Sequence, residues 1–257
     1  MKADAPRQKT YELLALAFQR PSAQQLKAMT ALEAVDVLTR ASAVVPWPAS
    51  TDACVYLRLF LMEAKSKARA ALANSLAGAP PGPESRLRSA EARSDGLATL
   101  ARVLTIEYCR LFVGPYSLPC PPYGSVYLDG GQAMGASTID ALSRYCRAGL
   151  RPATTWSEPP DHIAVELQFM AYLSAGYVAA ADAGHEEDAC RLLDMQRDFL
   201  RDHVGRWGPV FAERLKGAAS CHLYRFLGEV LGAWLTFDED FLDAVVEALP
   251  RTRASCG

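Results

Sequence analysis

The sequence predicts an all-α protein built as a helical bundle. Over most of the 257-residue chain, apolar residues recur at intervals of three and four, the period of an amphipathic helix. Alternation of apolar and polar residues with β-branched side chains, which marks strands, is nearly absent. No repeat of fixed period is present, which argues against a solenoid. We therefore expect about ten helices in one bundle.

The composition is that of a soluble globular protein. Half of the residues are hydrophobic, 22% are charged and the formal net charge is −2. A chain of this length buries a substantial core. The near-neutral charge provides no basic surface for nucleic acid. No uninterrupted apolar run reaches about 18 residues, so we expect no stable membrane insertion.

Cysteine usage and the N-terminus both favour the cytoplasm. The seven cysteines are an odd number without a CxxC pair, which suits reduced thiols better than a disulfide framework. The first ten residues lack the apolar segment of a signal peptide. We expect the protein to remain in the cytoplasm as a monomer, with a domain-swapped dimer as the alternative.

The N-terminal helical part is expected over about 1–118. A first helix ends at Arg20-Pro21, because proline interrupts the helical hydrogen bonds. Two further helices are expected at about 22–44 and 51–76. Residues 78–93 are rich in Pro, Gly and charge and are predicted to form a mobile surface loop. Ser94 or Asp95 then caps a helix that ends before Gly114-Pro115.

A stiff, Pro-rich segment follows, and we predict that it is extended over 119–131. Two interpretations fit its prolines, glycines and aromatic residues: it packs over the core, or it lines a groove and acts as a hinge over 119–135.

The C-terminal helical part is expected over about 136–250. Its predicted helices are at 136–148, 160–182, 186–204, from about Gly208-Pro209 onward, around Leu223–Trp234, and at Phe241–Leu249.

The segment from Glu158 to Leu167 is predicted to begin the longest buried helix and to carry a candidate site. Its prolines suit the first turn of a helix, where a missing N–H costs little. One face of this helix is predicted to be buried in the core, and it carries Ile163, Leu167, Met170, Ser174 and Tyr177. The arc away from this stripe carries Asp161, His162 and Glu166, with Glu158 nearby. This carboxylate–imidazole cluster is either an N-capping Asp beside a hydrogen-bonded His, or a binding site.

Sequence patterns of enzymes are scarce in this chain. It has no P-loop, no GxGxxG after a strand, no GxSxG and no HExxH. None of the four histidines has a Glu three residues before it, as a di-iron bundle requires. We expect no catalytic residues, no cofactor and no metal. The alternative is an α-helical metal-dependent hydrolase using Asp161, His162 and Glu166, and a third possibility is a helical adaptor.

Aromatic residues at a spacing of four favour core packing rather than a cofactor site. They are Phe199, His203, Trp207 and Phe211. A second candidate site lies at the helix end containing Tyr108, Leu111 and Phe112 and in the Pro-Pro-Tyr loop after it. Acids beside an apolar groove suit a peptide with arginines at one end and apolar residues along the rest, the composition of a twin-arginine signal peptide.

Three separated motifs resemble the TorD/DmsD/NarJ family of redox-enzyme maturation chaperones. They are Tyr108-x-x-Leu111-Phe112-x-Gly114-Pro115, Pro121-Pro122-Tyr123-x-Ser125-Val126-Tyr127 and Glu158-Pro159-x-Asp161-His162-Ile163-Ala164-x-Glu166-Leu167. The later Phe199-Leu200-x-x-His203-x-x-x-Trp207 is similar to the family's C-terminal pattern. The resemblance covers roughly 95–235.

This resemblance implies a TorD-like fold of two helical halves joined by a Pro-rich hinge, within one domain over 1–257. It implies a chaperone that binds the twin-arginine signal peptide and apoprotein of a molybdopterin-dependent oxidoreductase, assists cofactor insertion and delays export. By position, Glu158, Asp161 and His162 are the implied peptide-recognition groups, with Glu166 in the same cluster. The implied apolar wall consists of Tyr108, Leu111, Phe112, Pro122 and Tyr127. Gly124 stands where family members often carry an acid.

Overall fold

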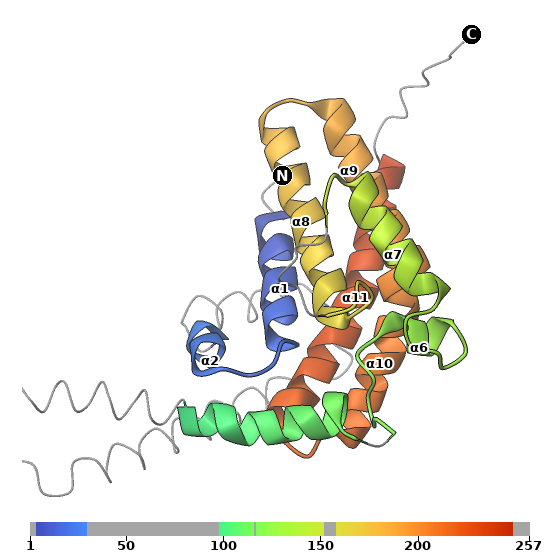
Figure 1. Cartoon of the computed structure of the whole chain (residues 1–257). Helices are drawn as coiled ribbons and strands as arrows, with labels where there is room; N and C mark the ends of the chain where they lie inside the picture. The colour runs from blue at the N-terminus through green and yellow to red at the C-terminus, as the bar shows by residue number, and fades with distance from the viewer. Residues whose placement is uncertain (1–3, 30–97, 116, 152–157, 249–257) are drawn as a thin grey trace, which may run out of the picture.

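A computed structural model describes residues 4–29, 98–115, 117–151 and 158–248. The described residues are helical with short connections, which confirms the all-α prediction (Figure 1). Among them, the β-structure is limited to an isolated antiparallel bridge between Tyr123 and His162. The helix predicted at 51–76, most of the one at 22–44 and the predicted loop at 78–93 lie outside the described residues.

The N-terminal helices end close to the predicted breaks at Pro21 and Gly114. Helix α1 (Asp4–Ala17) ends just before Pro21, and α2 (Ala23–Met29) begins after Ser22, whose hydroxyl accepts a hydrogen bond from the Gln25 backbone N–H at 3.1 Å. Residues 98–108 are helical and continue into the π-helical turn η1 (Cys109–Val113), which ends at Gly114. This helix lies across one end of the bundle (Figure 1).

The expectation that 119–131 is extended is wrong in its second half. Helix α6 (Gly124–Leu128) forms there. The segment before α6 is fixed by long-range hydrogen bonds: Ile163 N–H donates to Pro122 O at 2.9 Å, and Gly124 N–H donates to Asp161 O at 2.8 Å. These bonds come from residues about 40 positions away, so the local composition did not reveal the helix.

The C-terminal part consists of α7 (Ala136–Arg147), α8 (Ile163–Asp182), α9 (Glu186–Phe199), the π-helical turn η2 (Leu200–Val204), α10 (Gly205–Ala218) and α11 (His222–Ala248).

Two of the predicted boundaries in this part are wrong. The chain stays helical from α9 into α10, because a single π turn is accommodated inside a helix, and Pro209 lies inside α10 instead of starting a new helix. The helices predicted around Leu223–Trp234 and at Phe241–Leu249 form the single helix α11. Asp238, in the acidic stretch between the two predicted helices, is buried within α11, where it forms an ion pair with Arg7.

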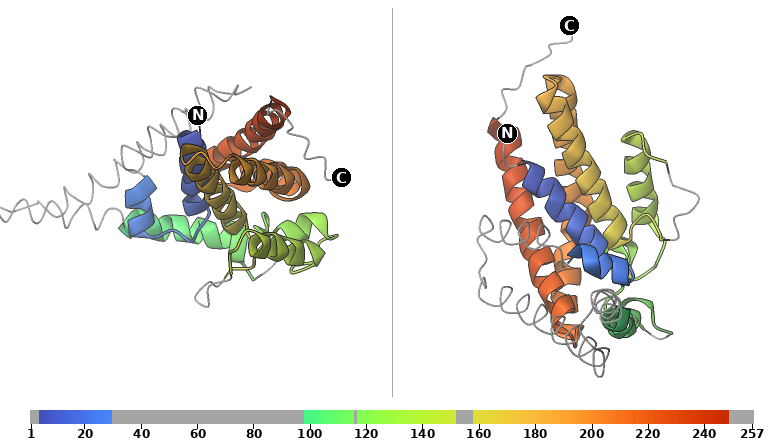
Figure 2. Two further views of the ribbon diagram at one scale, coloured as in Figure 1. Left: turned by 90° about the horizontal axis from the view of Figure 1, so that it is seen from above. Right: turned by 90° about the vertical axis from the view of Figure 1, so that its left-hand side faces the viewer.

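Helix α8 is the central element of the bundle. It packs against α1 and α9, while α10 packs against α11 (Figure 2). Among the described helices, α8 is the one long and apolar enough to span a membrane by length and composition alone, but more than half of that stretch is buried inside the protein. Of the predicted core stripe, Ile163, Leu167, Met170 and Ser174 are fully buried and Tyr177 is partly buried.

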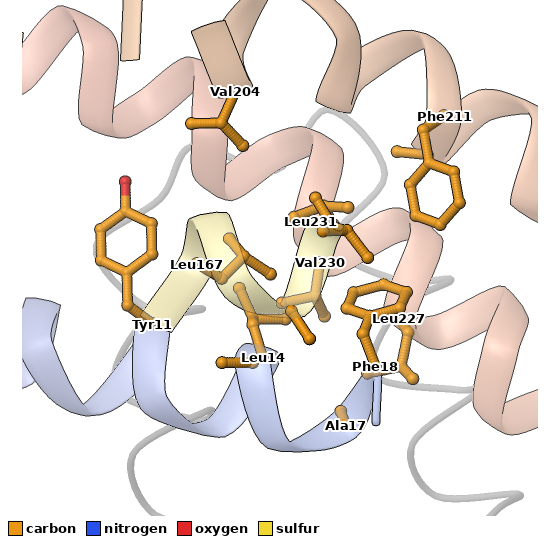
Figure 3. Packing of buried hydrophobic residues seen from close by; sticks show 14 of the residues in the cluster. Tyr11, Leu14, Ala17, Phe18, Leu167, Val204, Phe211, Leu227, Val230 and Leu231 are labelled. Atoms are coloured by element: carbon orange, nitrogen blue, oxygen red, sulfur yellow. The ribbon is translucent and has the colours of Figure 1, made fainter. Parts of the chain in front are cut away.

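The core is formed where α1, α8, α10 and α11 meet. Figure 3 shows Leu14 of α1, and Phe18 just after this helix, facing Leu167 of α8 and Leu227 of α11. Phe18 also packs edge-to-face on Phe211 of α10, with ring centroids 5.6 Å apart. Burial of such side chains stabilises each by about 1.5–3 kcal/mol relative to exposure, so α1 is held to the bundle mainly by its apolar face.

A buried ion pair joins the first and last helices. Arg7 of α1 donates from Nε to Asp238 of α11 at 2.5 Å and from Nη2 at 2.9 Å. Tyr11 OH donates to the same carboxylate at 2.6 Å, and Arg7 Nη2 also donates to Gln196 of α9 at 3.0 Å. All four side chains are buried. The network satisfies charges that the core could not otherwise hold.

We expect Asp238→Ala to lower the free energy of unfolding by about 3–5 kcal/mol, because it leaves the Arg7 charge buried without its carboxylate. Chemical denaturation followed by circular dichroism measures this loss. Asp240→Ala, an exposed acid on the same helix, is the matched control and should change stability little. Equal losses in the two variants would contradict the assigned role of the ion pair.

Candidate functional site

The predicted recognition segment meets the start of α6 at the N-terminal end of α8. Asp161 is fully buried there, and its Oδ2 accepts a hydrogen bond from the Ser125 backbone N–H at 2.8 Å. Asp161 therefore caps α6, which is distant in sequence. The interpretation of Asp161 as the N-cap of α8 is wrong, because α8 begins two residues later, at Ile163.

His162 performs the capping of α8. Its Nδ1 accepts a hydrogen bond from the Ala164 backbone N–H at 3.1 Å, and its ring packs edge-to-face on Tyr123. Burial lowers the pKa of His162 to about 4, although the Asp161 charge opposes this shift. The imidazole is therefore neutral near pH 7, as an acceptor at Nδ1 must be. Its Nε2 lies 4.0 Å from Glu158 Oε2.

Glu166 is the fully buried centre of a second polar network. Its Oε2 accepts a hydrogen bond from Trp207 Nε1 at 2.9 Å, and its Oε1 lies 2.8 Å from His203 Nδ1. His203 Nε2 lies 2.9 Å from the Ser137 carbonyl oxygen. Because a carbonyl only accepts, Nε2 must carry a proton, and the contact at Nδ1 then requires a second proton on the ring or the carboxyl group.

The pKa directions agree with a proton held between these two groups. Burial raises the pKa of the Glu166 carboxyl, although His203 and Trp207 oppose the rise. Burial by itself lowers the pKa of His203, but the Glu166 charge and its hydrogen bond outweigh that effect, so the pKa is raised. The network thus ties α8 to η2 and α10.

Gly124 leaves the space that this network occupies. A Cβ at this position would lie 2.9 Å from Trp207 Nε1 and 3.2 Å from Glu166 Oε1. The absence of an acidic side chain at Gly124 therefore has a steric reason in this chain: Trp207 and Glu166 already occupy the position.

The expected apolar wall does not lie at the surface of this structure. Leu111 and Phe112 are part of the hydrophobic core, and Tyr108 is also buried. Pro122 is buried at the start of α6, while Tyr127 is partly buried and stacks on Trp207 with ring centroids 5.4 Å apart.

Among the predicted recognition groups, Glu158 is the exposed one, with 42% of its side chain accessible. Asp161, His162 and Glu166 are buried and engaged in hydrogen bonds with the protein itself.

Sequence reasoning missed His203 and Trp207 as partners of Glu166. The predicted core packing of Phe199, His203, Trp207 and Phe211 is confirmed, since all four are buried. One feature of the sequence does indicate this network. The ring nitrogens of His203 and Trp207 and the carboxylate of Glu166 all lie at positions predicted to be buried, and buried polar groups need hydrogen-bonding partners.

The alternative of a metal-dependent hydrolase gains no support from the geometry. The Asp161 carboxylate and the His162 Nδ1 each accept a backbone N–H, and Glu166 faces His203 and Trp207. Within the described residues, no group of three or more His, Cys, Asp or Glu side chains is arranged to hold a metal ion.

The fold and the site define the class: an all-α protein whose buried acids and imidazoles join helices at the N-terminal end of the central helix. The family model described as nitrate reductase delta subunit matches residues 63–213, more than half of the chain. The chain belongs to this family, that of the TorD, DmsD and NarJ redox-enzyme maturation chaperones. The predicted resemblance is confirmed.

Curated relatives agree with this assignment. The chain is 28% identical over 144 residues to the chaperone protein TorD of Vibrio cholerae, covering 56% of this chain and 64% of TorD. It is 33% identical over 122 residues to the Tat proofreading chaperone DmsD of Salmonella typhi, covering 47% and 53%. The chain thus spans less than two thirds of the length of these relatives. Both are chaperones, in agreement with the prediction that the chain is not an enzyme.

One solved structure also resembles this chain. It comes from Archaeoglobus fulgidus and is described as a redox enzyme maturation protein. It shares 19% sequence identity, with a TM-score of 0.45 over 92% of this chain and 93% of the other.

Acidification should destabilise the protein through His162. The unfolded residue titrates near pH 6.5 and the folded one near 4, so the unfolded chain binds the proton first and the free energy of unfolding falls as the pH drops through this window. At about pH 5 the loss from His162 is about 2 kcal/mol relative to neutral pH.

Denaturation curves at the two pH values, compared between the wild type and His162→Asn, measure this contribution. Asn keeps a capping acceptor without a titrating ring, so the variant should lose about 2 kcal/mol less on acidification. His185→Asn, at an exposed histidine, is the control. An identical pH dependence in the wild type and His162→Asn would contradict the assignment.

Gly124→Ala should lower the free energy of unfolding by about 1–3 kcal/mol, the usual effect of overpacking a core. The new methyl group would press on Trp207 and Glu166. Gly217→Ala is the matched control: it is also a helical glycine, but its Cβ would point into open space, so the substitution should stabilise α10 by about 0.5–1 kcal/mol. Thermal unfolding of the two variants tests the difference in sign, and stabilisation by Gly124→Ala would refute the steric argument.

Proposed function

We propose that this protein is a cytoplasmic chaperone for a molybdopterin-dependent oxidoreductase. It binds the twin-arginine signal peptide and the apoprotein of the catalytic subunit, assists cofactor insertion and delays export. The observation that carries the proposal is the family match over residues 63–213, which includes the α6 and α8 segments of the site. Relatives named as Tat proofreading chaperones support it.

In this proposal, Glu158 is the direct contact for arginine. Its side chain is 42% exposed, and the His162 ring, 4.0 Å away, is neutral and offers no competing charge. A guanidinium pairs a carboxylate through two parallel hydrogen bonds. Asp161, His162 and Glu166 then act as positioning residues, because they fix the backbone on either side of α8's first turn.

Tyr108, Leu111, Phe112, Pro122 and Tyr127 belong to the proposed binding region as its inner support. In the described conformation they hold the helix that ends in η1, and α6, against the core. They contact the peptide directly only if these elements separate.

The proposed hinge over 119–135 is best located after α6. Residues 122–125 are bonded to the start of α8, whereas Gly130 and Gly131 have φ angles of 68° and 92°. Such angles suit glycine and permit a change of chain direction. A hinge here would separate the N-terminal part, about 1–118, from the C-terminal part, about 136–250, and is also the place where a domain swap would begin.

Glu158→Gln should weaken the binding of a twin-arginine leader peptide about two- to fivefold, the effect of losing a solvent-exposed charge pair. The difference from wild type should shrink as salt is added, because salt screens exposed charges. Titration calorimetry with the full chain at low and moderate salt measures both effects.

Glu187→Gln, an exposed glutamate at the start of α9, is the matched protein control, and a peptide with alanines in place of the two arginines is the ligand control. Absence of binding by the wild type would overturn the proposed function. Binding that depends on the arginines but is unchanged in Glu158→Gln would move the contact to another acid.

A further inference from the structure

An apolar pocket that the sequence did not indicate lies beside Glu158. It is lined by residues of α7 and α8 and by Glu158 and Pro160 just before α8. Helix α7 lies on the side of α8 away from α1 (Figure 2). Its volume is about 340 Å³. This is within the range of pockets that hold small organic ligands and is more than one side chain needs.

The lining of the pocket is predominantly apolar and aromatic. Its apolar and aromatic side chains include Leu142, Tyr145, Leu150, Val165, Phe169 and Tyr172. The two tyrosine hydroxyls already donate to backbone carbonyls, Tyr145 to Pro160 at 2.7 Å and Tyr172 to Ala148 at 3.3 Å. The pocket therefore requires no polar group from a ligand at these positions and favours apolar side chains.

Glu158 gives the pocket an exposed carboxylate that can pair with a cation. Glu158 belongs to the lining, and in the described part of the chain it forms no ion pair with a lysine or an arginine. Arg151, also in the lining, disfavours a second cation at its own position. A peptide with adjacent arginines followed by apolar residues suits this lining, because one of its arginines pairs with Glu158 and the apolar side chains enter the pocket.

We propose that this α7–α8 pocket receives the apolar side chains that follow the arginine pair of the leader peptide. The inference rests on the proposed function and adds a surface pocket to the expected apolar wall, of which Leu111 and Phe112 are core residues here. The apolar segment leaves water on entering the pocket, so binding has a negative heat-capacity change.

Two variants test the pocket in the full-length protein. Leu142→Asn makes one wall polar while keeping the number of non-hydrogen side-chain atoms, and Tyr172→Ser removes a ring that is 43% exposed. Ile139→Asn is the matched control, because Ile139 is on the same helix α7, is 67% exposed and does not line the pocket. Circular dichroism establishes that all three variants are folded.

The probe is a synthetic peptide with two adjacent arginines followed by a segment of leucine, alanine and phenylalanine. We expect Leu142→Asn and Tyr172→Ser each to raise its Kd about tenfold, as loss of a central apolar contact does, and Ile139→Asn to leave it unchanged. A second peptide keeps the arginines and replaces the apolar segment with serines. It should bind the wild type more weakly and be insensitive to both pocket variants.

The outcomes separate this inference from the proposed function. If the wild type binds neither peptide, the proposed function falls, and this inference with it. If the wild type binds in a Glu158-dependent manner but both pocket variants bind equally well, only the pocket assignment is overturned. The same holds if Leu142→Asn converts a dimer to a monomer in sedimentation without weakening the peptide, because a second copy would then occupy the pocket.

Photo-crosslinking provides a readout that does not depend on affinity. A benzoylphenylalanine in the apolar segment of the first peptide should crosslink to residues of α7 and α8, including Leu142 and Tyr172, and mass spectrometry identifies the sites. Crosslinks confined to the helix over 98–113 would overturn the assignment.

Discussion

The burial of Glu166 in the middle of the bundle is the constraint on which the arrangement around α8 depends. A carboxylate removed from water is tolerated only when hydrogen-bonding partners surround it. The partners are His203 of η2 and Trp207 of α10. Their positions also fix α6, because the indole and the carboxylate exclude a side chain at Gly124. One buried acid thereby sets the relative placement of four elements.

Two further buried carboxylates extend this arrangement in different directions. Asp161 accepts an N–H from α6, and Asp238 binds Arg7 and Tyr11 of α1. The apolar core supplies most of the driving force for folding but is tolerant of small shifts between helices. Hydrogen bonds have a defined direction and do not tolerate such shifts, since separating the partners leaves a buried polar group unpaired. The three carboxylates therefore specify how helices from both ends of the chain meet.

The polar residues of the Glu158–Leu167 motif therefore have two different roles. Most of its polar side chains face inward and hold the protein together, while Glu158 remains at the surface beside an apolar pocket. The buried groups give this surface a fixed geometry. In the proposed function, the Glu158 carboxylate pairs with an arginine of the leader peptide. Because the backbone next to it is already fixed, the chaperone loses little conformational entropy, which offsets part of the entropy that the peptide loses on binding.

The sequence by itself determined the all-α class, the breaks at Pro21 and Gly114, the buried stripe of α8 and the family. Each depends on local spacing or on a motif read along the chain. Tertiary structure alone decided that α6 forms inside the Pro-rich segment, that α11 continues through Asp238, and that His162 rather than Asp161 caps α8. It also placed Leu111 and Phe112 in the core and created the pocket. The reason is physical: these outcomes depend on contacts between residues far apart in sequence, and periodicity shows which face of a helix is apolar but not which partner covers it.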